Sequence, residues 1–254
     1  MSTSSISQFK YQPEKIMTGT VYCYIKSNLD GSNPARVFIR VMDRENLDVW
    51  KFEAHNYDAA HVTAHMDWES FSADRIQSSV VTSDGKSEDR ALLTTSSADA
   101  TCSVRFGGQS ETINIGHFPV HVYNFDFISL NFSLRHWSEP YGDVEIGIIQ
   151  PNFDPNRDGF IKYEGNVLLQ YLGEETRNSM PCLKYSIGGE GLQGQRGFIW
   201  VDRDLMHAVD IEIPIPDNPD WNSFKFNLIS VQQMNKEAWQ QFMNAEIQKL
   251  APVE

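Results

Sequence analysis

The sequence predicts a mainly β fold: an antiparallel open barrel or strongly curved sheet of lipocalin-like, half-barrel type, with one C-terminal helix. Short runs rich in β-branched and aromatic residues alternate with Gly-, Asn- and Asp-rich turns along most of the chain. Residues 60–69 alternate with a period of two, and residues 235–250 change to helical spacing. We expect a disordered polar tail over 1–15 and a single domain over 16–254, because β barrels of about 250 residues are common as one unit.

The elements follow one another almost without pause. Residues 83–101 are rich in Ser, Thr and Asp, which indicates a long loop between weak strands. The apolar and aromatic run at 110–137 is expected to be strand, bent at Pro119, because proline cannot donate to a strand ladder. Further strands are expected at 19–26, 36–42, 49–55, 144–149, 165–172, 182–187, 196–202, 207–213 and 224–231.

The run at 60–69 gives the clearest strand. Its apolar residues occupy every second position from Ala60 to Trp68, and polar residues fill the positions between them. A helical alternative would place His61, His65 and Glu69 on one face, but it would spread the apolar residues around the cylinder. We therefore expect a half-buried strand.

The C-terminal segment is expected to be a helix over about 235–250. Trp239, Phe242, Met243 and Leu250 recur at helical spacing, and Asn235 is a suitable N-cap. We expect this narrow apolar stripe to plug an end or an open side of the sheet.

Charge and cysteine content limit the class of partner and the compartment. The net charge is −13, and the basic residues are scattered singly, which disfavours nucleic acid and anionic membranes. No stretch reaches the length of a membrane span, and residues 1–15 lack the apolar core of a secretory signal. Three widely spaced cysteines fit a reducing compartment. We expect a cytoplasmic protein that binds a small neutral or lipophilic molecule.

The C-terminal half carries a family resemblance. Between residues 162 and 231 the chain has, in order, YEGNVLLQYLGEE, KYSIGGEGL after Cys182, GFIWVDRD, HAVDIEIPIP and FKFNLISV. This order resembles a broad family of uncharacterised bacterial β-proteins with an open-barrel fold similar to that of periplasmic lipoprotein carriers. The resemblance implies a curved antiparallel sheet partly wrapped around a helix. Such relatives are usually exported, in contrast to the cytoplasmic expectation, and the resemblance transfers no catalytic residue.

The polar face of the strand at 60–69 is the first candidate site. His65 and Asp67 are about 7 Å apart along a strand, so their tips can meet. A carboxylate beside an imidazole suits general acid–base chemistry. His61 and His65 are about 13 Å apart and cannot bind one metal from this strand alone. The alternative is an ordinary solvent face.

The second candidate lies at 113–127. Counting by two places His117, His121, Tyr123, Phe125 and Phe127 in one register, which is the pattern of an apolar pocket with a few polar groups. Asp126, on the other face, points inward if a bulge shifts the register. The alternatives are core histidines with satisfied hydrogen bonds, or a four-histidine metal site formed with His61 and His65.

The third candidate is a calcium loop. Asp154, Asn156, Asp158 and Gly159 match the start of such a loop, but its twelfth position is Gly165 instead of a bidentate Glu. The flanking residues indicate a turn and a strand, so this is not an EF-hand. Calcium is the one possible ion, no organic cofactor is expected, and the alternative is an ordinary Asp/Asn/Gly turn.

Together these observations favour a small-molecule pocket in a β-barrel. Our first interpretation is a cofactor-independent lyase, isomerase or cyclase for a small lipophilic substrate, in which His65, Asp67 and His121 converge on one concavity. A non-catalytic binder or carrier of a lipophilic ligand is the alternative, and a structural or interaction module without a pocket is the third. The candidate acid–base groups are His65, Asp67, His121, Tyr123 and Asp126. The candidate pocket aromatics are Trp50, Trp68, Phe125, Phe127, Phe198 and Trp200.

Overall fold

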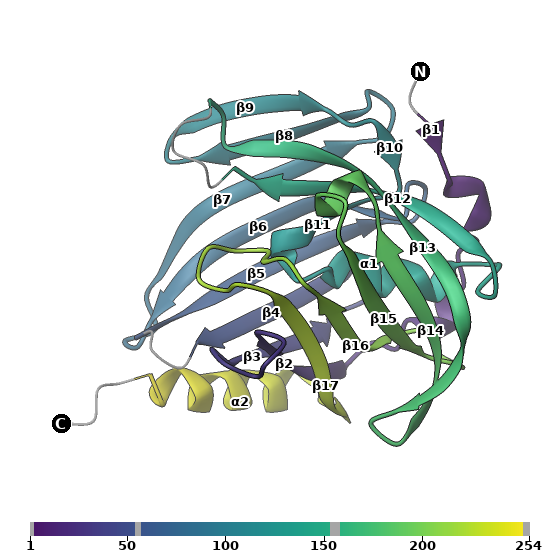
Figure 1. The fold of residues 1–254 in the computed structure, drawn as a ribbon. Coiled ribbons are helices and arrows are strands. Elements are labelled where there is room, and N and C mark those ends of the chain that lie inside the picture. The colour runs from purple at the N-terminus through teal and green to yellow at the C-terminus, as the bar shows by residue number, and fades with distance from the viewer. Residues whose placement is uncertain (1–2, 54–56, 153–157, 251–254) are drawn as a thin grey trace.

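The strand-like runs of the sequence form two successive series of strands (Figure 1). A computed structural model describes residues 3–53, 57–152 and 158–250. The first series is β2 (Thr20–Ser27), β3 (Ala35–Val41), β4 (Asn46–Glu53), β5 (Asp58–Asp67), β6 (Ser72–Thr82), β7 (Ser87–Ser96), β8 (Thr101–Phe106) and β9 (Gln109–Asn114). The second is β11 (Val120–Val122), β12 (Asp143–Pro151), β13 (Ile161–Arg177), β14 (Met180–Gly188), β15 (Arg196–Asp202), β16 (Ala208–Ile213) and β17 (Phe224–Gln233).

The two series join into one 15-stranded sheet through β17 and β2. Its order is β11-β12-β13-β14-β15-β16-β17-β2-β3-β4-β5-β6-β7-β8-β9. All neighbouring pairs are antiparallel except β11 with β12, which is parallel. No strand pairing within the described residues connects β9 to β11, so the curved sheet stays open. The predicted open, strongly curved antiparallel sheet is therefore confirmed.

Alternation along the strands builds the core on the concave face. On β5, Ala64 and Met66 are buried in the main apolar cluster, whereas His65 between them is partly exposed. The strand interpretation of this segment is confirmed. The same alternation on β2 sends Tyr22 and Tyr24 into the main cluster and Val21 to the opposite face.

A short helical segment fills the concavity (Figure 1). It comprises η3 (Tyr123–Phe125), α1 (Ile128–Ser133) and η4 (Leu134–His136), where η denotes a short 3-10 helix. The prediction of strand over 110–137 is wrong for this part. All six α1 residues are buried, so the segment has no polar face from which a helical period can be read. Asp126 and Phe127 have φ values of 52° and 53°, and this left-handed pair turns the chain from β11 into α1.

The polar run at 83–101 also differs from expectation. It forms β7 and the turn that leads into β8, and this turn covers only residues 97–100. Leu93 on β7 and Cys102 on β8 are both buried. The apolar face of the hairpin is thus formed by a few side chains that stand out little in a polar run.

Residues 3–15 pack against one end of the sheet, contrary to the disordered tail predicted for this part of the chain. Phe9 is buried and stacks on Phe71 with ring centroids 5.2 Å apart, and Lys10 N–H donates to the His136 carbonyl at 2.8 Å. Apolar residues within the polar run provide this docking. The elements are β1 (Thr3–Ser4), which pairs with β10 (His117–Phe118), η1 (Ile6–Gln8) and η2 (Pro13–Lys15).

The C-terminal helix α2 (Lys236–Gln248) confirms the predicted helix, and the Asn235 side chain caps it by accepting from Ala238 N–H at 2.8 Å. It does not plug an end of the sheet. Trp239 and Met243 pack on the convex face of β2–β5, against Val21 and Phe38, as the position of α2 below these strands shows (Figure 1). The indole N–H of Trp239 donates to Asp48 at 2.6 Å.

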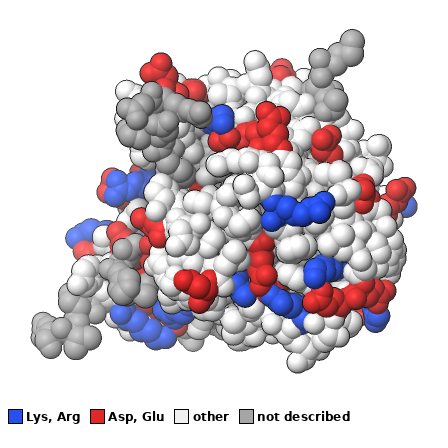
Figure 2. Space-filling model, viewed as in Figure 1, with Lys and Arg blue, Asp and Glu red and all other residues white. Residues whose placement is uncertain are grey.

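The surface carries both charge signs. On the face shown in Figure 2, Lys and Arg side chains lie among Asp and Glu side chains and do not form one block. In the part of the chain that the structure describes, no helix is long and apolar enough to cross a membrane.

Candidate functional site

An apolar pocket lies on the concave face where β8 and β9 approach the start of β13. Its volume is about 390 Å³. Phe160, just before β13, lies with its ring 6.2 Å from Phe106 of β8, and its N–H donates to the Glu111 carboxylate of β9. We call this the seam pocket. Its main apolar side chains are Val62, Ile76, Leu93 and Val104 on one wall and Val122, Phe125, Phe160 and Ile161 on the other.

Few polar groups reach the seam pocket. Ser78, Arg90, Asn124 and Asn152 contribute to its lining. The Asn124 amide donates to the Asp217 carbonyl at 3.1 Å, which fixes its direction. Arg90 lies 3.4 Å from Glu88 at the surface. Among the described lining residues Arg90 is the single titratable side chain. A mostly apolar cavity with a few polar groups is the usual form of a small-molecule site.

A buried ion network lies behind the wall that η3 provides. The Lys26 ammonium is 2.9 Å from Asp126 and 2.7 Å from Asp217, and the Lys51 ammonium is 2.8 Å from the other oxygen of Asp126. Lys26 also lies 4.0 Å from the centre of the Trp221 ring. Two lysines and two aspartates balance in charge. The network ties η3 to β2, to β4 and to the segment before β17.

The aspartates of this network differ in pKa. Burial alone would raise the pKa of Asp126, but the ammonium groups of Lys26 and Lys51 lower it overall. Burial raises the pKa of Asp217 to about 6, even though Lys26 opposes the shift. Tyr123 lies beside them, and its hydroxyl donates to the Ile215 carbonyl at 2.7 Å. The structure thus brings together two of the predicted acid–base residues, Tyr123 and Asp126. Both make contacts that fix η3 against neighbouring segments.

His65 and Asp67 lie away from this region. His65 is on the convex face, where Nδ1 is 2.6 Å from Asp74, and Asp74 raises its pKa although partial burial opposes the rise. Asp67 closes the turn after β5 by accepting from Glu69 N–H at 3.0 Å and from the Ser70 hydroxyl at 2.6 Å. Asp74 therefore pairs with His65, and Asp67 stabilises the turn after β5.

His121 is buried inside the sheet. Its Nδ1 is 3.1 Å from the Ser129 hydroxyl of α1, and burial lowers its pKa to about 3. Because His65 and Asp67 face outward, the predicted convergence of His65, Asp67 and His121 is wrong. The four-histidine metal site is wrong as well, since His61 pairs with Asp48 at 2.7 Å on the convex face. The polar side of β5 faces outward because its apolar side supplies the core.

One of the six predicted pocket aromatics, Phe125, lines the seam pocket. Trp50 stacks on His61 at 4.3 Å, and Trp68 packs on Tyr11 at 5.5 Å beside the N-terminal segment. Phe127 is fully buried in the core, and Trp200 packs with Phe198 in a small cluster with Cys182 and Val209. Composition identifies apolar strands, but strand register decides which residues line a cavity.

The calcium prediction falls mostly outside the described residues. Asp154 and Asn156 lie there, whereas Asp158 is described and exposed. The Asp158 backbone carbonyl accepts from the Asn152 side chain at 3.4 Å. Calcium binding at Asp154, Asn156 and Asp158 stays a prediction.

The sequence interpretation missed Lys26, Lys51 and Asp217. One signal was available for Lys26: it follows Tyr22 and Tyr24 at period two on a strand whose inner face is apolar. A lysine on such a face needs a carboxylate partner. The identity of that partner depends on contacts between residues about 100 and 190 positions away, which a single sequence does not show.

Comparisons with known proteins give the fold some context. No protein-family model and no curated protein matches the chain. Similar solved structures include a DUF1329 family protein from Desulfovibrio piger, with 10% identity over 92% of this chain and 94% of that chain and a TM-score of 0.34. An outer membrane lipoprotein-sorting protein domain from Vibrio parahaemolyticus has 8% identity over 90% and 91%, with a TM-score of 0.32. An exported protein with a YmcC-like fold from Bacteroides fragilis has 12% identity over 89% and 100%, with a TM-score of 0.30. At these identities and TM-scores the likeness carries no argument about family, ligand or activity.

Proposed function

We propose that the chain is a non-catalytic binder or carrier that holds a small lipophilic molecule in the seam pocket. The observation that carries this proposal is an apolar cavity of about 390 Å³ with walls from both ends of an open sheet. Pockets for small molecules typically have volumes of about 300–1,000 Å³ and mostly apolar linings.

The lining favours a binder over an acid–base enzyme. General acid–base catalysis needs titratable groups within hydrogen-bond reach of the reacting atoms. Among the described lining residues Arg90 alone titrates, and an arginine keeps its proton at physiological pH. The carboxylates and histidines that the sequence suggested for this chemistry are paired on the convex face or enclosed in the core.

The pocket predicts moderate affinity. A drug-sized ligand gains about 0.3 kcal/mol per non-hydrogen atom, so one of about 20 such atoms binds with about 6 kcal/mol. That corresponds to a Kd of tens of micromolar. A carrier that must release its cargo fits this range.

Binding can be tested with N-phenyl-1-naphthylamine, a neutral apolar probe that becomes fluorescent in apolar surroundings. Ala91→Phe places a ring in the seam pocket from β7. Leu92→Phe adds the same ring at the neighbouring position, whose side chain points to the other face of the strand. We expect saturable binding to the native chain, at least a tenfold rise in Kd for Ala91→Phe, and a change below twofold for Leu92→Phe. Equal affinity in all three proteins, or no saturable binding, would rule out the proposal.

A further inference from the structure

A second group of polar side chains is buried at the other end of the internal helical segment. Arg135 of η4 is 1% exposed, and its guanidinium carbon is 4.1 Å from the ring centre of Phe132 and 4.8 Å from that of Tyr22. Its Nη1 donates to the Tyr22 hydroxyl at 2.9 Å and lies 3.5 Å from the Lys15 carbonyl. Arg135 is thus a fixed positive charge in an aromatic environment.

Most of the Arg135 hydrogen-bonding capacity is unused within the protein. Nε and Nη2 meet no acceptor among the described residues, and no described carboxylate pairs with the guanidinium. Lys26, which is buried to the same degree, is held by two aspartates. Arginine stays protonated in proteins, and an unpaired buried charge costs several kcal/mol. Among the described residues, Arg135 therefore lacks the counter-charge that Lys26 has.

His207 provides further free nitrogens in the same neighbourhood. It is 4% exposed, its ring lies 5.5 Å from the Tyr22 ring, and both ring nitrogens lack a partner among the described residues. Burial and the nearby Arg135 charge lower its pKa to about 4, so at neutral pH it offers one N–H. Tyr22 is in contact with both side chains. The surroundings of Tyr22 therefore combine one full positive charge with spare donors from Arg135 and His207.

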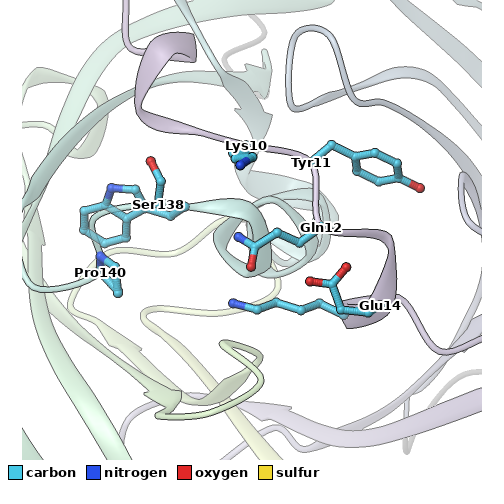
Figure 3. Close-up of a pocket in the computed structure, with 8 residues that line it drawn as sticks. Lys10, Tyr11, Gln12, Glu14, Ser138 and Pro140 are labelled. Carbon is cyan, nitrogen blue, oxygen red and sulfur yellow. The ribbon is translucent and has the colours of Figure 1, made fainter.

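A pocket of about 580 Å³ lies next to the end of η4, where Trp137 and Ser138 line it. The N-terminal segment forms much of its wall, with Lys10, Gln12 and Glu14 on one side and Ser138 and Pro140 on the other (Figure 3). Lys15 also lines it, and the Lys15 carbonyl contacts Arg135. Two lysines and one glutamate therefore line this pocket. Their net charge of one positive unit favours an anion.

From this juxtaposition we infer that Arg135 and His207 bind a small monovalent anion, either a halide or a carboxylate, close to the pocket that the N-terminal segment lines. Halide and carboxylate share the chemistry that the site requires: one negative charge and several acceptor lone pairs. The inference is independent of the seam pocket, which is formed by other residues.

Chloride-35 NMR tests this inference, because bound chloride broadens the resonance of the chloride in exchange with it. We expect excess line width with the native chain and its reduction by sodium formate at constant ionic strength. Arg135→Gln should abolish the excess. Arg196→Gln, which removes an exposed arginine, should retain it. Displacement by formate shows that the site also accepts a carboxylate, whereas broadening that formate does not displace shows a site for halide alone.

Thermal unfolding gives a second measurement, which applies to formate as well as to chloride because it does not depend on an NMR signal from the anion. Chloride or formate should raise the Tm above that in gluconate, a much larger anion, at equal sodium concentration. The rise in Tm should be lost in Arg135→Gln. If that variant does not fold, His207→Gln should show the rise only at anion concentrations at least threefold higher than the native chain needs. The inference is wrong if the native chain shows neither excess chloride broadening nor a Tm difference between these anions. It is also wrong if the effects persist in the folded variants.

Discussion

Acidification should destabilise this protein strongly, because burial lowers the folded-state pKa of His117 and, more strongly, of three other buried histidines. Burial lowers the pKa of His121 and His136 to about 3, and burial with the Arg135 charge lowers that of His207 to about 4. The unfolded chain protonates each near pH 6.5. The stability that these groups contribute is therefore complete above pH 6.5 and is lost as the pH falls towards the folded pKa values.

The size of the effect follows from linkage. Between pH 6.5 and 5 each of these three histidines costs about 2 kcal/mol of unfolding free energy, or about 6 kcal/mol for the three. Asp217 acts in the opposite direction, because its folded pKa of about 6 lies above its unfolded value. Its protonation raises the free energy of unfolding by about 1.4 kcal/mol between pH 7 and pH 5. His65, whose pKa Asp74 raises, also favours the folded state at low pH. We expect a net loss of about 5 kcal/mol from pH 7 to pH 5, comparable with the total stability of many domains.

Urea unfolding at pH 7, 6 and 5, followed by tryptophan fluorescence, measures this dependence. His121→Gln removes one of these three histidines and should reduce the loss between pH 6 and 5 by about 1.4 kcal/mol. Leu130→Ala, a buried α1 substitution without a titratable group, should lower stability equally at each pH. If His121→Gln and Leu130→Ala show the same pH dependence as the native chain, burial does not control the protonation of His121.

Three further predictions concern the helix, the ion network and the loop. Trp239→Ala should lower the free energy of unfolding by about 3–5 kcal/mol while leaving probe affinity unchanged, and an unchanged Tm would show that α2 does not stabilise the sheet. Lys26→Met should cost about 3–5 kcal/mol in urea unfolding because it leaves Asp126 and Asp217 without their shared ammonium; a cost below 1 kcal/mol would show that the network is not closed in solution. Titration calorimetry on chelator-treated protein should detect at most weak calcium binding that Asp158→Ala removes, and submicromolar binding that survives this substitution would place the ion elsewhere.

The sequence predicts the sheet well because its strands have one polar and one apolar face. Residues 60–69 show the rule, since the alternation of polar and apolar side chains predicts the strand; the predicted convergence failed because it required the polar face of this strand to turn inward. The same logic fails for Ile128–Ser133, because a helix enclosed on every side carries no periodic signal. This error also affected the predicted site, because His121 was assigned to the same long strand as Tyr123 and Phe125.

The candidate site was less predictable because it depends on contacts between distant segments. Lys26 meets Asp126 and Asp217 through three separate parts of the chain. The seam pocket lies where β8 and β9 approach Phe160 and the start of β13 without a strand pairing, and this approach depends on the curvature of the whole sheet. Phe125 was identified for its aromatic character, whereas Leu93 and Val104 become lining residues through register alone.

The central claim is that the seam pocket holds the ligand, and methyl NMR tests it most directly. Isoleucine, leucine and valine methyl groups would be labelled and N-phenyl-1-naphthylamine added in steps. The account predicts saturable shift changes at Ile76, Leu93, Val104 and Ile161, with none at Ile229, an exposed residue of β17. Shift changes confined to the convex face or to α2, with the four seam methyl groups unmoved at saturation, would contradict it.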